Sequence, residues 1–482
     1  MKINYPETII RKSKGMNSSE EYLSSLCNNT FLSLWSYPNL YIDKGRKNKK
    51  GDGKELCDLL VVFEEHVIIF SDKTCDFPST SDIRLNWSRW FKRTIKSSAS
   101  QILGAERNIK DNHSNIYLDK ECTKKLPVIV PNDNKAKLHR IIVANGASEA
   151  CRNHFNGGSG SLLINTTIVE DEHWDLNNAD LLPFYIGKIN VEHGYIHIFD
   201  DITLGIVMQT LDTVTDFIQY LVCKEKLMNE KTVFAFGEED IIAEYLKNID
   251  INGNHCFAEE EIYDKASSFL FSEGNWLDFC NNLSRLAQIE ENKISYLWDG
   301  LIEKFLFHVT TGTSECMTPP TISEQEMLFR LMAKENRTRR RVLSKALSEL
   351  VDKTPPGRRN TRGVTIENST TSYFFFLFPY SSNFCSYEEY RKVRRVFLND
   401  YLIISKTKLP NILDIIGLAI DTYNPDSQHN SEDLLYLDVR DWTNDDQIHA
   451  EQLEKEYLEN GWLRDRVYLE NEVREYPDII NN

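Results

Sequence analysis

The sequence predicts an α/β amino-terminal domain, a mainly helical middle region and an α+β carboxyl-terminal domain. Two apolar runs rich in Val, Ile and Phe, joined by a polar turn at Glu64 and Glu65, predict a buried β-hairpin over residues 54–75. Apolar residues at helical spacing precede and follow this hairpin, and strand-like runs recur after residue 364. A chain of 482 residues is long enough for several domains. We place the domains at residues 1–200, 201–363 and 364–482.

The elements around the hairpin follow the order helix, three strands, helix, strand. A helix is expected from Ser18 to Trp35, with its apolar side chains on one face, and Pro38 separates it from a short strand at 39–42. The hairpin supplies the next two strands. A second helix is expected over residues 87–110, and the last strand over residues 138–144.

The later elements are expected to be helical first and mixed afterwards. A strand at 195–199 leads into a helix at 204–228, and residues 234–330 are expected to be largely helical, without a repeat. A basic helix that starts near residue 323 runs into a Pro/Gly/Arg loop, T-P-P-G-R-R-N-T-R-G. The last domain should contain strands at 373–378, 412–420 and 434–439, and helices at 387–398 and 445–460.

The hairpin carries charged residues where a purely structural strand would be apolar. Asp58 lies in its first run, and Ser71, Asp72 and Lys73 end its second. Burial of a carboxylate or an ammonium group without a partner costs several kcal/mol, so these residues are expected to have a function. The alternative is an unrelated α/β domain in which Asp58 and Lys73 form an ion pair.

The arrangement resembles the PD-(D/E)xK nuclease superfamily, whose restriction-endonuclease-like core has the same order of elements. Asp58 matches the first acid of the family motif, and Lys73 matches its lysine. The second acid should fall at Ser71, because residues two apart lie on the same side of a strand, and here the chain departs from the family. Three alternatives follow: a bulge turns Asp72 inward, another element supplies the ligand, or the site is inactive.

The resemblance implies a Mg²⁺-dependent endonuclease, with Mn²⁺ as an alternative metal, that hydrolyses phosphodiester bonds, with DNA as the expected substrate. A lysine in this place would stabilise developing negative charge, and several branches of the superfamily have a glutamine near the site. The alternative for Glu20 is a first-turn acid favoured by the helix dipole. The alternative for Glu55 and Gln101 is a solvated surface residue. The expected catalytic residues are Asp58, Asp72, Lys73 and Gln101. The expected metal ligands are Asp58, Asp72, Glu20 and Glu55.

A second likeness covers about the first third of the chain. The segments C-D-L-L-V-V-F, H-V-I-I-F-S-D-K, W-S-R-W and Q-I-L-G-A-E look like those of a group of uncharacterised bacterial proteins of similar length. This likeness implies a bacterial origin and a role in restricting foreign DNA, as in defence against phage. The alternative function is a catalytically inactive module of the nuclease fold that binds nucleic acid or protein.

Basic segments indicate a polyanionic partner, although the chain has a net charge of −17. Residues 44–54 carry six basic residues and one acid, and the expected second helix adds more, with Trp87, Trp90 and Phe91 interleaved. Residues 334–363 have a net charge of +7, and either contact nucleic acid or pair with residues 431–482, whose net charge is −10. The expected nucleic-acid contacts are Lys47, Lys49, Lys50, Arg89, Lys92, Arg93, Arg340 and Arg341.

Cysteine spacing and hydropathy favour a cytoplasmic protein with no membrane partner. The ten cysteines form no Cys-x-x-Cys pair, so structural zinc is not expected and the thiols are expected to be reduced. The amino terminus, M-K-I-N-Y-P-E, lacks an apolar core, and the longest apolar run, residues 373–380, is too short to cross a bilayer. A single site that must cut both strands of a duplex favours a homodimer, with a partner protein as the alternative.

Overall fold

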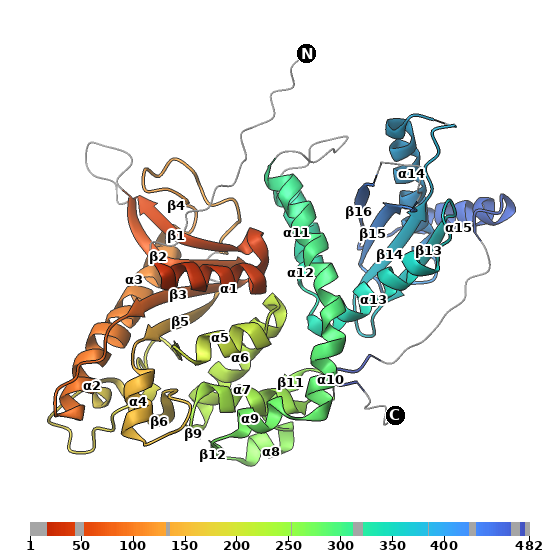
Figure 1. Cartoon of the computed structure of the whole chain (residues 1–482). Helices are drawn as coiled ribbons and strands as arrows, with labels where there is room; N and C mark the ends of the chain where they lie inside the picture. The colour runs from red at the N-terminus through yellow and green to blue at the C-terminus, as the bar shows by residue number, and fades with distance from the viewer. Residues whose placement is uncertain are drawn as a thin grey trace. The chain divides into compact units, whose positions relative to one another are not determined.

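The chain is a mixed α/β protein that forms two compact units (Figure 1). The computed structural model describes residues 17–43, 53–131, 135–251, 253–311, 322–383, 385–423, 430–463 and 473–477. The first unit comprises Met1–Ala287, Ile302–Gln325 and Asp478–Asn482, and the second comprises Gln288–Leu301 and Glu326–Pro477. The expected boundaries at residues 200 and 363 differ from this division. Strands β8 and β13 lie at those two positions, and each is paired within a sheet.

A six-stranded sheet organises the first unit, with the order β4-β1-β2-β3-β5-β8. Strands β1, β2 and β3 pair antiparallel, whereas β3, β5 and β8 pair parallel. The hairpin turns at Glu64, which adopts a φ of 53°. The strands expected at 39–42, in the hairpin and at 138–144 are therefore present. The bounds are β1 (Ser36–Asp43), β2 (Gly53–Phe63), β3 (His66–Thr74), β4 (Ile116–Tyr117), β5 (Lys137–Asn145) and β8 (His197–Asp200).

Helices cover both faces of this sheet. Phe31 of α1 (Ser18–Trp35) packs against Phe70 of β3, with 6.5 Å between ring centroids. On the other face, the side chain of the next residue, Ser71, bonds Gln101 of α3. Consecutive strand residues point to opposite faces, so α1 and α3 lie on opposite sides of the sheet. The second expected helix is one rod made of α2 (Ile83–Phe91), the π-helical turn η1 (Lys92–Lys96) and α3 (Ser97–Asn112).

Helix α1 ends in a break at Leu32, whose φ of 60° and ψ of 169° are not helical. Ser33 follows the break, and both its backbone N–H and its hydroxyl donate to the carboxylate of Glu303, at 2.6 and 2.7 Å. Glu303 lies on α11, more than two hundred residues along the chain, so a contact distant in sequence stabilises the junction between α1 and β1.

The region after β8 differs from the single long helix that the sequence predicts. Two helices, α5 (Thr203–Thr210) and α6 (Val214–Glu230), replace the helix expected at 204–228, because Thr213 caps α6 by accepting the N–H of Asp216. A second sheet, with the order β12-β9-β6-β7, also lies in the first unit. Three of its four strands have only four residues, the lower limit at which alternation can be recognised in a sequence. The four strands are β6 (Leu163–Val169), β7 (Tyr185–Lys188), β9 (Thr232–Ala235) and β12 (Ser268–Phe271).

The remaining elements between residues 148 and 310 are short. The two-stranded sheet of β10 (Asn248–Ile249) and β11 (His255–Cys256) lies within the segment that we expected to be largely helical. The helices are α4 (Ser148–His154), α7 (Glu238–Lys247), α8 (Glu260–Lys265), α9 (Asn275–Cys280), α10 (Leu283–Asn292) and α11 (Tyr296–Thr310), with 3₁₀ turns η2 (Glu170–His173) and η3 (Lys293–Ser295).

The second unit contains a four-stranded sheet with the order β13-β14-β15-β16. The strands expected near 373–378, 412–420 and 434–439 are β14 (Thr371–Phe378), β15 (Asp414–Asp421) and β16 (Glu432–Asp438). Strand β13 (Asn360–Thr365) lies in the segment that we predicted to be a loop, because pairing with β14 supplies backbone hydrogen bonds that composition does not reveal. The helices are α12 (Ile322–Ala333), α13 (Arg337–Lys353), α14 (Tyr387–Lys406) and α15 (Asn444–Glu459).

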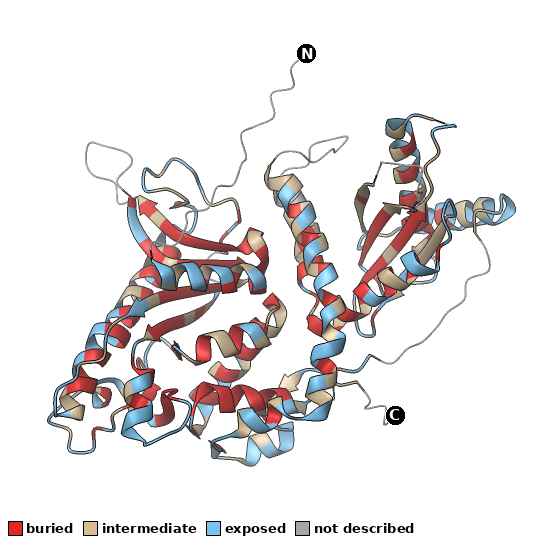
Figure 2. Cartoon of the chain, viewed as in Figure 1, coloured by how far each residue is buried: buried red, intermediate tan, exposed pale blue. Residues whose placement is uncertain are grey.

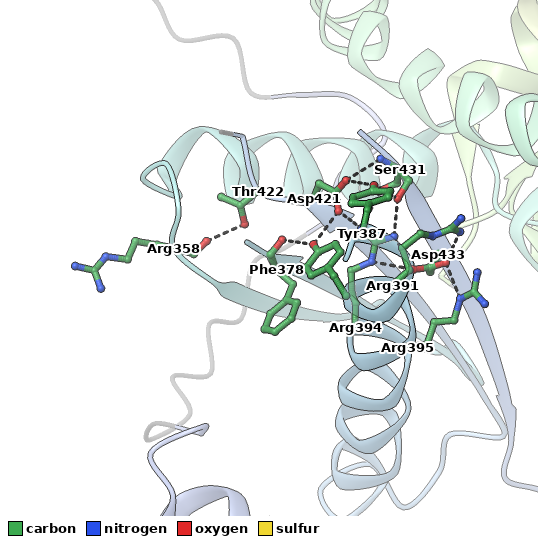
Figure 3. A network of polar contacts seen from close by, with 11 residues as sticks. Arg358, Phe378, Tyr387, Arg391, Arg394, Arg395, Asp421, Thr422, Ser431 and Asp433 are labelled. Atoms are coloured by element: carbon green, nitrogen blue, oxygen red, sulfur yellow. Dashed lines mark hydrogen bonds and ion pairs between the residues drawn. The ribbon is translucent and has the colours of Figure 1, made fainter. Parts of the chain in front are cut away.

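A buried ionic network fastens α14 to β15 and β16 (Figure 3). The Arg394 side chain is 0% exposed. It forms ion pairs with Asp421 and Asp433 and donates to the Ser431 carbonyl oxygen at 3.1 Å. Buried side chains otherwise line the strands and the helix faces turned toward them (Figure 2). We interpret the network as structural, since its charges neutralise one another inside the unit.

Candidate active site

Asp58 and Gln101 meet on the face of the sheet that α3 covers. Leu59 pairs with Phe70, so Asp58, the residue before Leu59, shares the face of Ser71. One carboxylate oxygen of Asp58, Oδ2, accepts the backbone N–H of Asp72 at 2.6 Å, and Oδ1 accepts the Gln101 amide at 3.3 Å. The Ser71 hydroxyl donates to Gln101 Oε1 at 3.0 Å. Gln101 therefore links the serine at the motif position to the aspartate and fixes the orientation of both.

The Asp72 carboxylate points to the opposite face, toward α1. Its Oδ2 accepts the Ser19 hydroxyl at 2.6 Å, and its Oδ1 accepts the Asn145 amide at 3.1 Å. Asn145 Nδ2 also donates to Ser19 Oγ at 3.0 Å. The pairing of β3 with β5 runs through Asp72 without a register shift, so no bulge turns Asp72 toward Asp58. Only the backbone of Asp72 reaches Asp58.

Four carboxylates nevertheless influence one another at this end of the hairpin. Burial raises the pKa of Asp58, against the hydrogen bonds from Asp72 and Gln101, and Glu20 adds a negative charge. Burial raises the pKa of Asp72 to about 6. The Ser19 hydrogen bond opposes this shift, and the negative charges of Asp58 and Glu20 add to it. At the solvent edge, partial burial followed by the charges of Asp58 and Glu20 raises the pKa of Glu55. The structure thus brings Glu20, Glu55, Asp58 and Asp72 into one electrostatic cluster.

Lys73 lies beside this cluster and is exposed to solvent. Because it is two residues after Ser71 on β3, it belongs to the face of Asp58 and Gln101. Within the described ranges it forms no ion pair or side-chain hydrogen bond. The ion pair between Asp58 and Lys73, which was the structural alternative, is therefore not formed in this structure, and the ammonium group is accessible to a ligand.

Two buried contacts hold the α2–α3 rod in place over the site. Arg140 of β5 forms a two-point ion pair with Glu106 of α3, with distances of 2.7 and 2.8 Å. At the other end of the rod, the Trp90 indole N–H donates to the Cys75 carbonyl oxygen at 3.0 Å, just beyond β3. These contacts determine where Gln101 lies relative to Asp58.

Carboxylate oxygens are suitable ligands for a hard divalent cation, but those of this cluster do not form a complete coordination shell. Among the described residues, no group of three or more His, Cys, Asp and Glu side chains could hold a metal ion. Mg²⁺ commonly binds one or two carboxylates and takes its other ligands from water and substrate phosphates. Neither Asp58 nor Asp72 forms an ion pair with a described cationic side chain. Carboxylate oxygens are the kind of ligand that Mg²⁺ and Mn²⁺ take, and of the two aspartates only Asp58 lies on the face of Gln101 and Lys73.

The expected nucleic-acid contacts near the hairpin have different outcomes. Lys47, Lys49 and Lys50 lie outside the described residues. Arg89, Lys92 and Arg93 are exposed on the α2–α3 rod. The interleaved aromatic residues are not available for base stacking, because Trp87, Trp90 and Phe91 are all fully buried.

The distant basic segment pairs with acids of its own unit. Arg340 is 0% exposed and forms an ion pair with Asp299 at 2.6 Å. Arg341 is also buried and donates to the Asn292 side chain at 2.8 Å and to carbonyl oxygens of Arg474 and Glu475. Neither guanidinium group is placed to contact a phosphate backbone. The expected alternative was pairing with residues 431–482; Arg341 reaches carbonyl oxygens of that segment, whereas the ion pair of Arg340 is with Asp299, outside it.

Ser19 and Asn145 are members of the site that the sequence reasoning missed. Asn145 ends β5 beside Thr74 at the end of β3, and these two strands are parallel. Polar residues at the carboxyl ends of neighbouring parallel strands gather at one edge of a sheet, so this position was a usable signal. Ser19 could be seen only as a helix-start residue next to Glu20.

Comparisons of the chain with protein-family models, with curated proteins and with solved structures gave no match. In the described ranges, every helix is too short or too polar to cross a membrane. Function is therefore inferred from the geometry of the site.

Proposed function

We propose that the first unit is a metal-dependent nuclease that hydrolyses phosphodiester bonds, with DNA as its substrate. The observation that carries this proposal is a pair of half-buried carboxylates, Asp58 and Asp72, next to an exposed lysine and without a described cationic partner for either aspartate. Burial raises the pKa of both aspartates, with smaller contributions from neighbouring carboxylates, and titratable groups perturbed in this way cluster at functional sites. The bacterial defence role implied by the likeness to bacterial proteins belongs to this proposal.

The chain's own residues would divide the work in a simple way. Asp58 would be the principal metal ligand, with Asp72 and Glu20 adding negative charge from the α1 side, and Glu55 from the solvent edge. When bound, the ion would supply positive charge against the scissile phosphate and lower the pKa of the attacking water. Lys73 would bind a phosphate oxygen and stabilise the charge that develops there. Gln101 would hold Asp58 in its orientation through the hydrogen bond at 3.3 Å.

A second candidate function is a nuclease fold that binds nucleic acid or protein without cutting. The observation that favours it is Ser71, which occupies the family's second acid position, faces Asp58 and is 0% exposed. On that face of the sheet, the Ser71 hydroxyl donates to the Gln101 amide oxygen at 3.0 Å. A site with one acid on the catalytic face binds a cation more weakly than a site with two.

Incubation of the purified protein with supercoiled plasmid, linear DNA and RNA separates the two functions. The reactions contain Mg²⁺, Mn²⁺ or a chelator, and the variants are Asp58→Ala, Lys73→Ala and the control Asp76→Ala, which removes an exposed carboxylate just beyond β3. Metal-dependent cutting that both active-site variants lose by at least about a hundredfold, and that the control keeps, supports the nuclease. Salt-sensitive binding without cutting supports the second function.

A further inference from the structure

The outer face of the α2–α3 rod carries a stripe of positive charge. Between Ile83 and Ala105 the sequence contains five basic residues and no acid, in a chain whose net charge is −17. Four of these residues are spaced as i, i+3, i+4 and i+7, which places them on one face of a helix. All four are exposed. We call this set the basic stripe: Arg89, Lys92, Arg93 and Lys96.

The basic stripe lacks the acidic partners that several exposed lysines have on other helices. Within the described ranges, none of its four side chains forms an ion pair, and Arg93 donates only to the Asp76 carbonyl oxygen, at 3.3 Å. Lys96 lies 4.5 Å from the centre of the Trp174 ring. By contrast, four exposed lysines on other helices each pair with a glutamate three or four residues away: Lys265, Lys293, Lys353 and Lys392.

The surroundings of the stripe favour a phosphate backbone as its partner. The rod's large apolar side chains are buried or half-buried, and none between Ile83 and Lys110 is exposed, so the stripe has no apolar group to insert into a membrane. The same burial removes Trp87 and Trp90 from base stacking. What remains is charge and hydrogen-bond donors, which recognise phosphates without reading bases.

The stripe is also rigidly connected to the candidate active site. Gln101, which bonds Asp58, lies on the same rod, so that Arg89 is about 18 Å from it along the helix axis at about 1.5 Å per residue. The stripe itself is about 10 Å long. That length matches about three successive phosphates of one strand of a duplex, at about 3.4 Å of axis per phosphate.

We propose that the basic stripe binds the sugar-phosphate backbone of the nucleic acid that the candidate active site cuts, independently of base sequence. This inference rests on the proposed function for the identity of the substrate. The stripe would position the strand, while Asp58 and Lys73 act on one phosphodiester.

Binding measured without cleavage tests the proposal. Fluorescence anisotropy with labelled duplex DNA, single-stranded DNA and duplex RNA is recorded in chelator over a range of salt concentrations. The stripe variant combines Arg89→Gln, Lys92→Gln, Arg93→Gln and Lys96→Gln. The control variant combines Lys265→Gln, Lys293→Gln, Lys353→Gln and Lys392→Gln, and it changes the net charge by the same amount.

We expect the stripe variant to bind at least about tenfold more weakly near physiological salt. The slope of log K against log salt should become shallower by about 3.6 for duplex DNA and about 2.8 for a single strand, if all four contacts are made. The control variant should bind within about twofold of the wild type, because its lysines are already paired. The three nucleic acids distinguish whether the backbone bound is that of a duplex or a single strand, and of DNA or RNA.

Several outcomes overturn the inference: no binding by the wild type, equal losses in the stripe and control variants, or wild-type affinity in the stripe variant. If the quadruple variant does not fold, the single change Lys92→Gln should still reduce the slope by about one. An Arg89→Lys, Arg93→Lys variant, which keeps the charge, should bind normally. Stripe-dependent binding without cutting in any metal retains this inference and refutes the nuclease, whereas cutting with stripe-independent binding does the reverse.

Discussion

Replacement of Asp72 by asparagine should stabilise the protein, because the ionised carboxylate lowers the free energy of unfolding in the native structure. Burial and the nearby negative charges raise its pKa from 3.8 to about 6. At about 1.4 kcal/mol per pKa unit, the ionised side chain lowers the free energy of unfolding by roughly 2–3 kcal/mol above neutral pH. The new amide can keep both contacts, since its oxygen can accept from Asn145 and its nitrogen can donate to Ser19 Oγ.

The sign of the pH dependence gives this prediction a signature. Between about pH 4 and 6 the folded chain binds the Asp72 proton more tightly than the unfolded chain does, so the stability contributed by this group rises as the pH falls. The advantage of Asp72→Asn should therefore be largest above pH 7 and disappear near pH 4. Thermal unfolding followed by intrinsic fluorescence should show a Tm about 5 °C higher for the variant at neutral pH.

Two comparisons make the test specific. The variant Asp76→Asn, which alters an exposed carboxylate just beyond the end of β3, should leave the Tm within about 1 °C of the wild type. A lower Tm for Asp72→Asn at neutral pH, or a gain that does not depend on pH, would refute the reasoning that repulsion and burial raise the pKa of Asp72. The stability gain should accompany weaker metal binding if the proposed function is correct.

Three further predictions concern metal, acid and the second unit. Mg²⁺ at ten times its Kd should raise the free energy of unfolding of the wild type by about 1.4 kcal/mol, and that of Asp58→Asn by much less; equal shifts in calorimetry would contradict a site at Asp58. Burial lowers the pKa of His66 from 6.5 to about 4, so the protein loses the stability that this group contributes as the pH falls from about 6.5 to 4. His66→Gln should therefore make the free energy of unfolding less dependent on pH in this range, by at most about 1.4 kcal/mol per pH unit in urea titrations. An unchanged slope would show that His66 does not contribute. Arg394→Leu removes the fully buried partner of Asp421 and Asp433 but leaves Asp433 its ion pairs with Arg391 and Arg395, so it should cost about 3 kcal/mol in urea unfolding of the second unit. A loss below about 1 kcal/mol would mean that solvent reaches the network.

Individual helices and strands could be predicted from the sequence where their patterns depend on residues close together in the chain. Alternation and helical spacing predicted α1, the hairpin of β2 and β3, the rod that includes α3, and strand β5. The same patterns placed Asp58 and Lys73 on adjacent segments. They did not predict the second sheet, whose strands are four to seven residues long, nor β13, whose composition is that of a loop.

Only the tertiary structure decided which polar groups meet. Asp72 bonds Ser19 and Asn145, which are 53 and 73 residues away in the sequence, and this pairing sets its direction away from Asp58. Arg340 is buried in an ion pair with Asp299, so the positive charge of this residue is not available to a ligand, although its segment is basic in sequence. The spacing of apolar residues along a helix or a strand follows from backbone geometry and can be recognised in the sequence. Burial and charge pairing depend on segments that come together only when the chain packs.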